Sequence, residues 1–143
     1  QPSPLPPPFR RQNSPPARFF LSTTYSTLGD LYLEQGDPAE ARRCYEESLA
    51  LRRALVGKVD ADALSDALAF SCYDLGVLDD GNKALLQEAQ KIWNDLALKY
   101  PDKPRYTELQ DAVSQELARR FPQDRGHCPN ASKGGFRWPW SRR

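Results

Sequence analysis

Apolar residues recur at spacings of three and four residues in five successive stretches of the chain. In an α-helix this spacing gathers them on one face, which can then pack against another helix. The stretches cover about 22–34, 38–56, 62–78, 83–100 and 103–122. The sequence therefore predicts an all-α fold of amphipathic helices joined by short turns.

The first two stretches predict a helical hairpin with a close contact at a glycine. Tyr25 and Tyr32 fall on one face of the first helix, and Gly29 leaves room there for a neighbouring helix. Asp37 is placed to cap the second helix, next to a proline that suits its first position. The inner face of this helix alternates small and bulky residues: Ala41, Cys44, Tyr45, Ser48 and Leu49. We expect the ring of Tyr45 to pack against Gly29.

These residues resemble the tetratricopeptide repeat (TPR), in which Trp and Phe are the commoner aromatics. The pattern is carried by Tyr25, Leu28, Gly29, Tyr32, Ala41 and Tyr45. The late proline of the repeat is absent, since Arg53 holds its position, so we expect the second helix to reach about Val56. The resemblance implies antiparallel helical hairpins stacked as an α-solenoid.

A second, irregular hairpin is expected over the next two stretches. Leu75-Gly76 repeats Leu28-Gly29, but the two glycines are 47 residues apart, against about 34 in a regular TPR array. Ala89, Trp93 and Pro101 resemble the small, aromatic and terminating positions of a second TPR helix. The expected buried face of this helix is Leu85, Ala89, Ile92, Trp93 and Leu96.

The last stretch predicts a single helix without the Leu-Gly pair. Its apolar face is Tyr106, Leu109, Val113, Leu117 and Phe121, and Asp102 is the expected N-terminal cap. A lone terminal helix can cover the open face of a repeat stack. The predicted architecture is thus two TPR-like hairpins plus a terminal capping helix, a fragment of an α-solenoid.

Composition separates the helical stretches from the two ends of the chain. Seven of the thirteen prolines lie in the first sixteen residues, and about the last twenty residues are rich in Gly, Pro, Arg and Ser. Because proline lacks an amide hydrogen, we expect residues 1–18 to be a disordered tail without helix. A TPR-like helical domain is expected over 19–122, and a basic, aromatic flexible tail over 123–143.

The net charge of +1 conceals an uneven distribution. Residues 21–122 hold eighteen acidic and twelve basic residues, whereas both ends are basic. This is not the charge distribution of a nucleic-acid-binding domain. No apolar run is long enough to span a membrane, and we expect a cytoplasmic protein. The chain has no methionine, which favours an internal piece or a processed form of a longer product.

Both ends offer alternative functions. Pro4 and Pro7 have PxxP spacing, and Arg11-x-x-Ser14-x-Pro16 loosely resembles a phosphoserine motif read by 14-3-3 adaptors. Near the other end, aromatic and basic residues alternate as in membrane-surface peptides and nucleic-acid arms: Phe136, Arg137, Trp138, Trp140, Arg142 and Arg143. Plain flexible ends are the favoured interpretation of both.

Catalytic chemistry is not expected. The only histidine, His127, lies beside Cys128 in the basic tail, where a nucleophile and a base are not held in place. Cys44 and Cys72 lie on apolar helix faces, as free thiols do in a reducing compartment. No phosphate-binding glycine loop and no metal-ligand spacing occurs. We expect no enzyme activity, cofactor, metal or small-molecule substrate.

The TPR resemblance also implies where a partner would bind. In TPR proteins the first helix of each hairpin lines a concave groove that accepts a peptide or a partner helix. The outward positions are Ser26, Thr27, Asp30, Leu33 and Glu34 in the first hairpin and, counted from Gly76, Phe70, Tyr73, Asp74 and Val77 in the second. TPR domains that bind a terminal carboxylate use Lys, Arg and Asn there, so Ser26 and Asp30 favour a neutral or basic ligand instead.

The leading hypothesis is a non-catalytic scaffold that binds a protein or peptide partner on the concave face. The alternatives are a helical domain whose C-terminal tail engages membrane or nucleic acid, and a regulatory appendage of a larger enzyme. About three units are usually needed for a stable repeat protein. With two hairpins and one helix, we expect a longer array or self-association, with the first helix as the open end.

Overall fold

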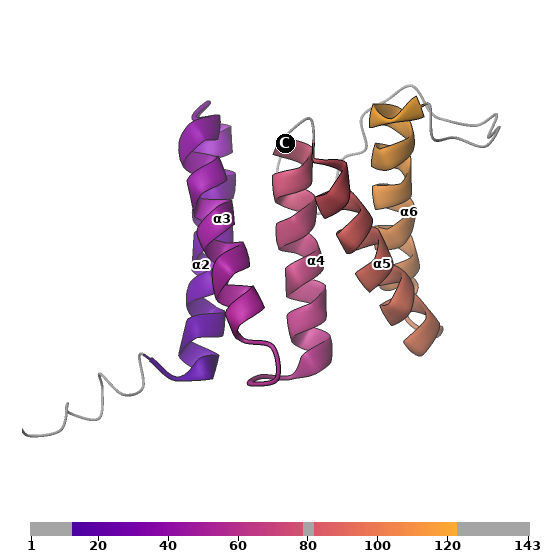
Figure 1. Ribbon diagram of the computed structural model, residues 1–143, viewed down its shortest axis with the longest axis horizontal. Helices are drawn as coiled ribbons and strands as arrows, with labels where there is room; N and C mark the ends of the chain where they lie inside the picture. Colours follow the sequence, from indigo (N-terminus) through magenta and orange to yellow (C-terminus); the bar gives the residue numbers. More distant parts are fainter. Residues whose placement is uncertain (1–12, 79–81, 123–143) are drawn as a thin grey trace, which may run out of the picture.

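The computed structural model describes residues 13–78 and 82–122 of the 143-residue chain. They form five α-helices (Figure 1): α2 (Pro15–Glu34), α3 (Pro38–Ala54), α4 (Ala61–Leu78), α5 (Lys83–Lys99) and α6 (Pro104–Arg120). No strand occurs in this part of the chain. The predicted all-α fold of two hairpins and a terminal helix is confirmed.

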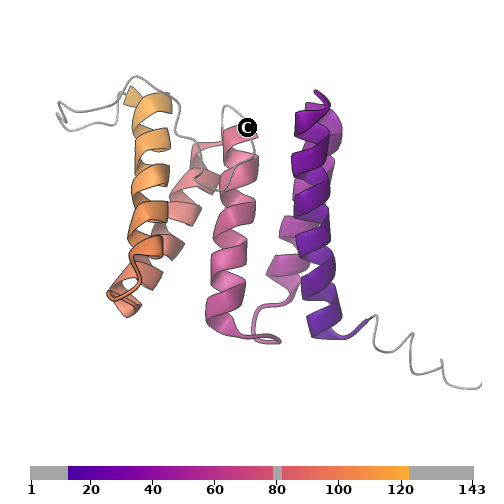
Figure 2. The same cartoon turned by 180° about the vertical axis from the view of Figure 1, so that it is seen from behind.

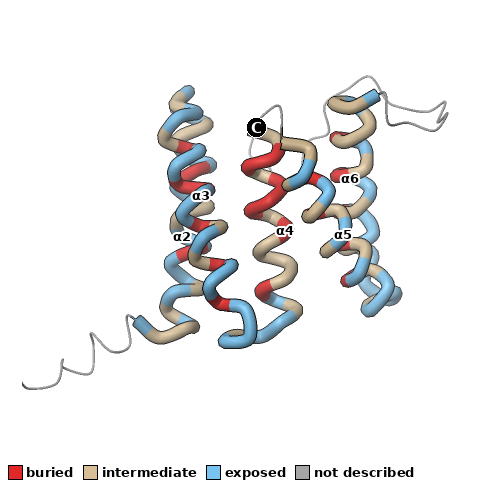
Figure 3. Tube along the Cα trace, in the orientation of Figure 1, coloured by how far each residue is buried: buried red, intermediate tan, exposed pale blue. Residues whose placement is uncertain are grey.

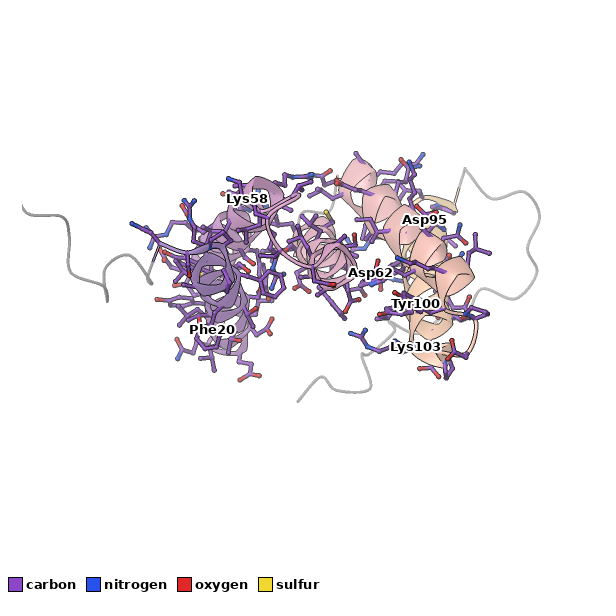
Figure 4. All side chains as sticks on the ribbon, turned by 90° about the horizontal axis from the view of Figure 1, so that it is seen from below. Phe20, Lys58, Asp62, Asp95, Tyr100 and Lys103 are labelled. Carbon is purple, nitrogen blue, oxygen red and sulfur yellow. The ribbon has the colours of Figure 1, made fainter. Side chains whose placement is uncertain are left out.

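The helices lie in two rows. Figure 2 shows α2, α4 and α6 side by side in front, with α3 and α5 behind them. Viewed along the helix axes in Figure 4, α2, marked by Phe20, and α5, marked by Asp95, lie on opposite sides of the molecule. The first helix of each hairpin therefore shares one face of the stack with α6.

The two ends of the chain, 1–12 and 123–143, lie outside the described residues. The expectations about the proline-rich tail, the basic aromatic tail, His127 and Cys128 stay predictions. None of the helices within 13–78 and 82–122 combines the length and the apolar character that crossing a bilayer requires.

Helix α2 begins earlier than the sequence suggested. Ser14 Oγ accepts a hydrogen bond from the Ala17 amide at 3.3 Å, and Pro15 and Pro16 occupy the first two helical positions. The amides of a first helical turn have no partner within the helix, so prolines are tolerated there. The expectation that residues 1–18 contain no helix is wrong for 15–18.

The contact between α2 and α3 depends on Gly29. Gly29 and Tyr45 are both buried, and a Cβ atom on Gly29 would lie 2.5 Å from Tyr45 Cε1. No side chain fits in this space, so the two backbones approach closely only with glycine here. The predicted packing of Tyr45 against Gly29 is confirmed.

Each turn between helices has its own local signal. Gly36 adopts a left-handed φ of 79°, and the Asp37 carboxylate then accepts the Glu40 amide at 3.2 Å. Asp60 and Asn82 cap α4 and α5 in the same way, with distances of 2.8 and 3.3 Å. These bonds satisfy amides that the helices leave open.

Two expected helix boundaries differ from the structure. Helix α3 ends at Ala54, two residues before Val56, and Gly57 follows with a φ of 79°. Asp102 does not cap α6, because this helix begins at Pro104 and Lys103 occupies the cap position without a side-chain bond. A proline at the first position fixed this start one residue later than predicted.

The main core lies between α4, α5 and α6. Trp93 is fully buried, and the ring of Phe70 packs edge-on against it with centroids 5.0 Å apart. Figure 3 shows buried positions along α4 and on the facing sides of its neighbours. The cluster comprises Ala69, Cys72, Tyr73, Leu86, Ala89, Trp93, Leu96, Leu109 and Val113.

The second hairpin differs from the first at its glycine. A Cβ atom on Gly76 would lie 2.8 Å from Leu86 Cγ, so a leucine occupies the space that Tyr45 fills in the first hairpin. Leu86 is fully buried, whereas Leu85, expected on the buried face, is only half-buried. The free thiols of Cys44 and Cys72 are buried as expected, and burial raises the pKa of Cys72 to about 12.

Candidate functional site

The nine residues expected to line a binding surface differ widely in exposure. The exposed ones are Thr27, Asp30 and Glu34, all on α2. The half-buried ones are Ser26, Leu33, Phe70, Asp74 and Val77. Tyr73 is buried, with 4% of its surface exposed.

Most of the half-buried residues serve the packing of the fold. Ser26 Oγ lies 2.8 Å from Ser48 Oγ of α3. Leu33 packs against the small cluster of Ala41, Tyr45 and Leu75, and Phe70 and Val77 pack against the main core. These side chains offer a partner only part of their surface.

The expectation that Tyr73 lines an accessible surface is wrong. Its ring packs against Trp93 with centroids 6.2 Å apart, and burial raises the pKa of its phenol. Tyr73 lies three residues before Gly76, and residues at this spacing share a helix face. Because Gly76 contacts α5 closely, Tyr73 also faces the core.

Asp30 and Asp74, which we call the acidic pair, carry most of the chemistry of this surface. Tyr45 Oη donates a hydrogen bond of 2.5 Å to Asp30 Oδ1, which holds the exposed carboxylate in place. Asp74 lies on α4 within electrostatic reach of Asp30. Neither carboxylate forms an ion pair with a Lys or Arg of the described residues.

The environment of Asp74 favours its protonated form. Burial raises the pKa of Asp74 to about 8, with the negative charge of Asp30 as a second cause and the positive charge of Arg52 acting against both. Near neutral pH this environment therefore favours the protonated form of Asp74. A ligand cation placed beside the acidic pair would displace that proton.

Arg52 of α3 joins the two hairpins from the inside. With 4% of its surface exposed, it donates from Nε to Ser22 Oγ at 3.1 Å and from Nη1 to Ser71 Oγ at 2.6 Å. Nη1 also donates to the Ala67 carbonyl at 2.8 Å, and Ser48 Oγ donates to the Ser22 carbonyl at 2.8 Å. These bonds form a buried polar network across α2, α3 and α4.

The role of Arg52 was not predicted from the sequence, although a signal was present. The inner face of α3 runs through Ala41, Tyr45, Ser48 and Arg52 at spacings of three and four residues. A charged residue on an otherwise buried face indicates a buried hydrogen-bond network, because a buried charge without partners is costly.

Comparison with protein families connects this geometry to a known repeat. The family model described as tetratricopeptide repeat matches residues 21–62. The match covers α2 from residue 21 onward and all of α3, including the contact of Gly29 with Tyr45, and it reaches the start of α4. Residues 21–62 form a tetratricopeptide repeat. Comparisons with curated proteins and with solved structures give no match.

The match connects residues 21–62 to a repeat family with a known general role. TPR repeats mediate protein–protein interaction, and TPR domains are generally non-catalytic scaffolds that bind protein partners. The second hairpin, α4 and α5, lies almost wholly outside the match and departs from the repeat at Leu86. Its stacking on the TPR hairpin brings Asp74 near Asp30.

Proposed function

We propose that this chain is a scaffold that binds a protein partner on the face shared by α2 and α4. The partner contributes an extended segment or a helix, and one of its Lys or Arg side chains binds between Asp30 and Asp74. Glu34 borders the segment on α2, and the exposed part of Phe70 contacts it on α4.

The observation that carries this proposal is the acidic pair itself. Two carboxylates from neighbouring hairpins lie within electrostatic reach of each other, and among the described residues neither forms an ion pair. Burial and mutual repulsion keep Asp74 protonated near neutral pH. A cation from a partner would remove the repulsion, which makes the surface complementary to a basic segment.

Proton linkage gives this proposal a measurable signature. A cation binds the ionised form of Asp74 better than the neutral form, so binding releases a proton wherever the free protein holds one. Affinity for a basic segment should then rise with pH up to about 8, the pKa of Asp74 in the free protein. The affinity should rise by at most about tenfold per pH unit.

A peptide-display selection against the whole chain tests the proposal. We expect the selected sequences to share a Lys or Arg, and the affinity of the synthesised peptides, measured by fluorescence anisotropy, to rise between pH 6 and pH 8. Asp30→Asn and Asp74→Asn should each weaken binding by about tenfold, a typical loss for one partner of a charge pair. Asp74→Asn should also remove the pH dependence.

Asp111→Asn is the matched control, because Asp111 is an exposed carboxylate on α6. It should leave both affinity and pH dependence unchanged. Selection of acidic peptides, or an equal loss in Asp111→Asn and Asp74→Asn, would contradict the proposed role of the acidic pair.

A further inference from the structure

The outer face of α2 carries most of the large apolar residues that are exposed in the described part of the chain. Six large apolar residues are exposed in the described part of the chain, and four of them lie on α2. They are Phe20 (74% exposed), Leu21 (44%), Leu28 (39%) and Leu31 (48%). Helix α2 stands at the end of the row of helices farthest from α6 (Figure 4).

These residues form one stripe, which we call the α2 stripe, together with Thr24 and Thr27. Positions 20, 24, 28 and 31 follow helical spacing on the side opposite Ser22 and Gly29, which are buried against α3. Thr24 Oγ1 donates to the Phe20 carbonyl at 3.2 Å, and Thr27 Oγ1 donates to the Thr23 carbonyl at 3.1 Å. Both hydroxyls are thus satisfied within the helix, and the stripe contains no charged residue.

We propose that the α2 stripe binds the same stripe of a second copy of this chain, with the two α2 helices antiparallel around a twofold axis. The arrangement of the large residues supports a second copy of the chain as the binding partner. If the twofold axis crosses the α2 stripe at the level of Ser26, Thr24 of one copy lies opposite Leu28 of the other. Phe20 and Leu21 of one copy then lie opposite Leu31 of the other. A twofold interface requires this self-complementarity, because each residue pair occurs twice.

The exposed area is sufficient for a small dimer interface. At roughly 200 Å² for a fully exposed large side chain, the four residues present about 400 Å², which is large for an apolar patch on a monomer. Two such stripes with their flanking residues bury more than about 1,000 Å² in total, the lower limit for a specific interface. We expect a dissociation constant in the micromolar range.

The opposite end of the stack does not offer an alternative surface for α2. The exposed positions of α6 are mainly polar or charged: Arg105, Thr107, Glu108, Asp111, Gln115 and Arg119. Packing the apolar α2 stripe against such residues would contribute little hydrophobic free energy to association. Stripe-to-stripe contact therefore gives a closed dimer, whereas head-to-tail contact would give an open filament.

Sedimentation equilibrium of the whole chain between about 5 µM and 1 mM tests the dimer, a range that brackets micromolar dissociation constants. The wild-type chain should change reversibly from monomer to dimer. Phe20→Lys and Leu31→Glu should each weaken self-association at least tenfold, because each places two charges in the apolar contact. Circular dichroism should show unchanged helix content, since both side chains are exposed.

An equimolar mixture of the two variants tests the antiparallel register. In the mixed dimer one contact pairs the introduced lysine of one copy with the introduced glutamate of the other, and the second contact keeps Phe20 against Leu31. We therefore expect the mixture to regain dimers that neither variant forms alone. A mixture that stays monomeric would overturn the antiparallel pairing.

Leu98→Glu is the matched control, because Leu98 on α5 is as exposed as Phe20, at 74%. It should leave the dimer intact, and an equal loss of self-association in this variant would overturn the role of the α2 stripe. A wild-type chain that remains monomeric at about 1 mM would overturn the dimer and leave the stripe to a helix of another protein.

Discussion

The side chain of Tyr45 has two roles, one performed by its aromatic ring and the other by its hydroxyl group. Its edge fills the space beside Gly29, and its hydroxyl holds the carboxylate of Asp30 at 2.5 Å. The residue that sets the distance between α2 and α3 thus also positions half of the acidic pair. Changes at Gly29 should consequently affect both stability and the proposed binding surface.

Gly29→Ala should destabilise the protein by about 1–3 kcal/mol, the usual cost of overpacking a well-packed contact. Helix propensity alone would favour alanine by about 1 kcal/mol, so the sign of the change identifies the clash with Tyr45. Chemical denaturation measures this difference. In a Tyr45→Leu background the penalty should largely disappear, while Thr27→Ala on the exposed side of α2 should have little effect in either background.

Asp74 should make stability depend on pH in the opposite direction from most carboxylates. Its pKa is raised from 3.8 in the unfolded chain to about 8 in the folded protein, so the folded state binds more protons between these values. The free energy of unfolding contributed by this group therefore falls as pH rises from about 4 to 8, by at most about 1.4 kcal/mol per pH unit. Asp74→Asn should remove this fall and stabilise the protein at pH 8.

Denaturant titrations of wild type and Asp74→Asn across pH 4 to 9 check the prediction. Asp111→Asn serves as the control, and the pH profile of its free energy of unfolding should follow that of wild type. Parallel profiles for wild type and Asp74→Asn would contradict it.

Helix α3 shows how one element can link two hairpins. Its Arg52 donates to Ser22 on α2 and to Ser71 on α4, so the last turns of α3 connect both neighbours by buried hydrogen bonds. The adjacent Arg53 makes a bidentate pair with Glu88 of α5, with both side chains more than a third exposed. The two arginines differ in burial while sharing a helix and a charge.

Arg52→Met should cost about 1–3 kcal/mol, because it leaves the buried hydroxyls of Ser22 and Ser71 and the half-buried Ala67 carbonyl without this donor. Arg53→Met should cost less than about 1 kcal/mol, as expected for an exposed ion pair. Thermal and denaturant unfolding of the two variants measure the difference. Equal losses would show that Arg52 contributes no more than a surface arginine.

Helix positions were predictable because their signals are local. Spacing of apolar residues, the cap at Asp37 and the glycine at 29 act within one or two turns, and all three predictions are confirmed. The start of α2 was not predicted, because prolines such as Pro15 and Pro16 can indicate a break in a helix. Prolines are also compatible with the first turn of a helix, which is where these two lie.

The rotation of α4 about its axis could not be read from its own sequence. It depends on Leu86 of α5 filling the space beside Gly76, a contact between separate elements. For the same reason Tyr73 was placed on the surface, and the proximity of Asp74 to Asp30 became visible only with both hairpins in place.

At the scale of the whole molecule, the two ends of the helix stack differ in character. Helix α6 contributes Leu109 and Val113 to the main core and turns polar residues outward, as a terminal capping helix does. Helix α2 leaves an apolar stripe uncovered. Among the described residues, the stack is therefore closed at the α6 end and open at the α2 end.

Removing α6 should abolish the cooperative unfolding transition. A chain ending at residue 102 exposes Trp93 and Leu96, which Leu109 and Val113 cover in the intact core. A chain ending at residue 122 should retain the wild-type midpoint, because it keeps every residue that the described part of the chain contributes to the main core. Calorimetry of the two truncated chains checks this prediction, and a sharp transition without α6 would contradict it.

The polar network around Arg52 also bears on how the protein meets a partner. Hydrogen bonds are directional and weaken steeply when the donor angle becomes strongly bent, whereas apolar contacts are non-directional. A partner that required a different curvature of the stack would first have to break the bonds from Arg52 to Ser22 and Ser71. The shape of the stack is thus preorganised, and we expect the proposed partner to be selected by how well it fits this shape and not by adjustment of the helices.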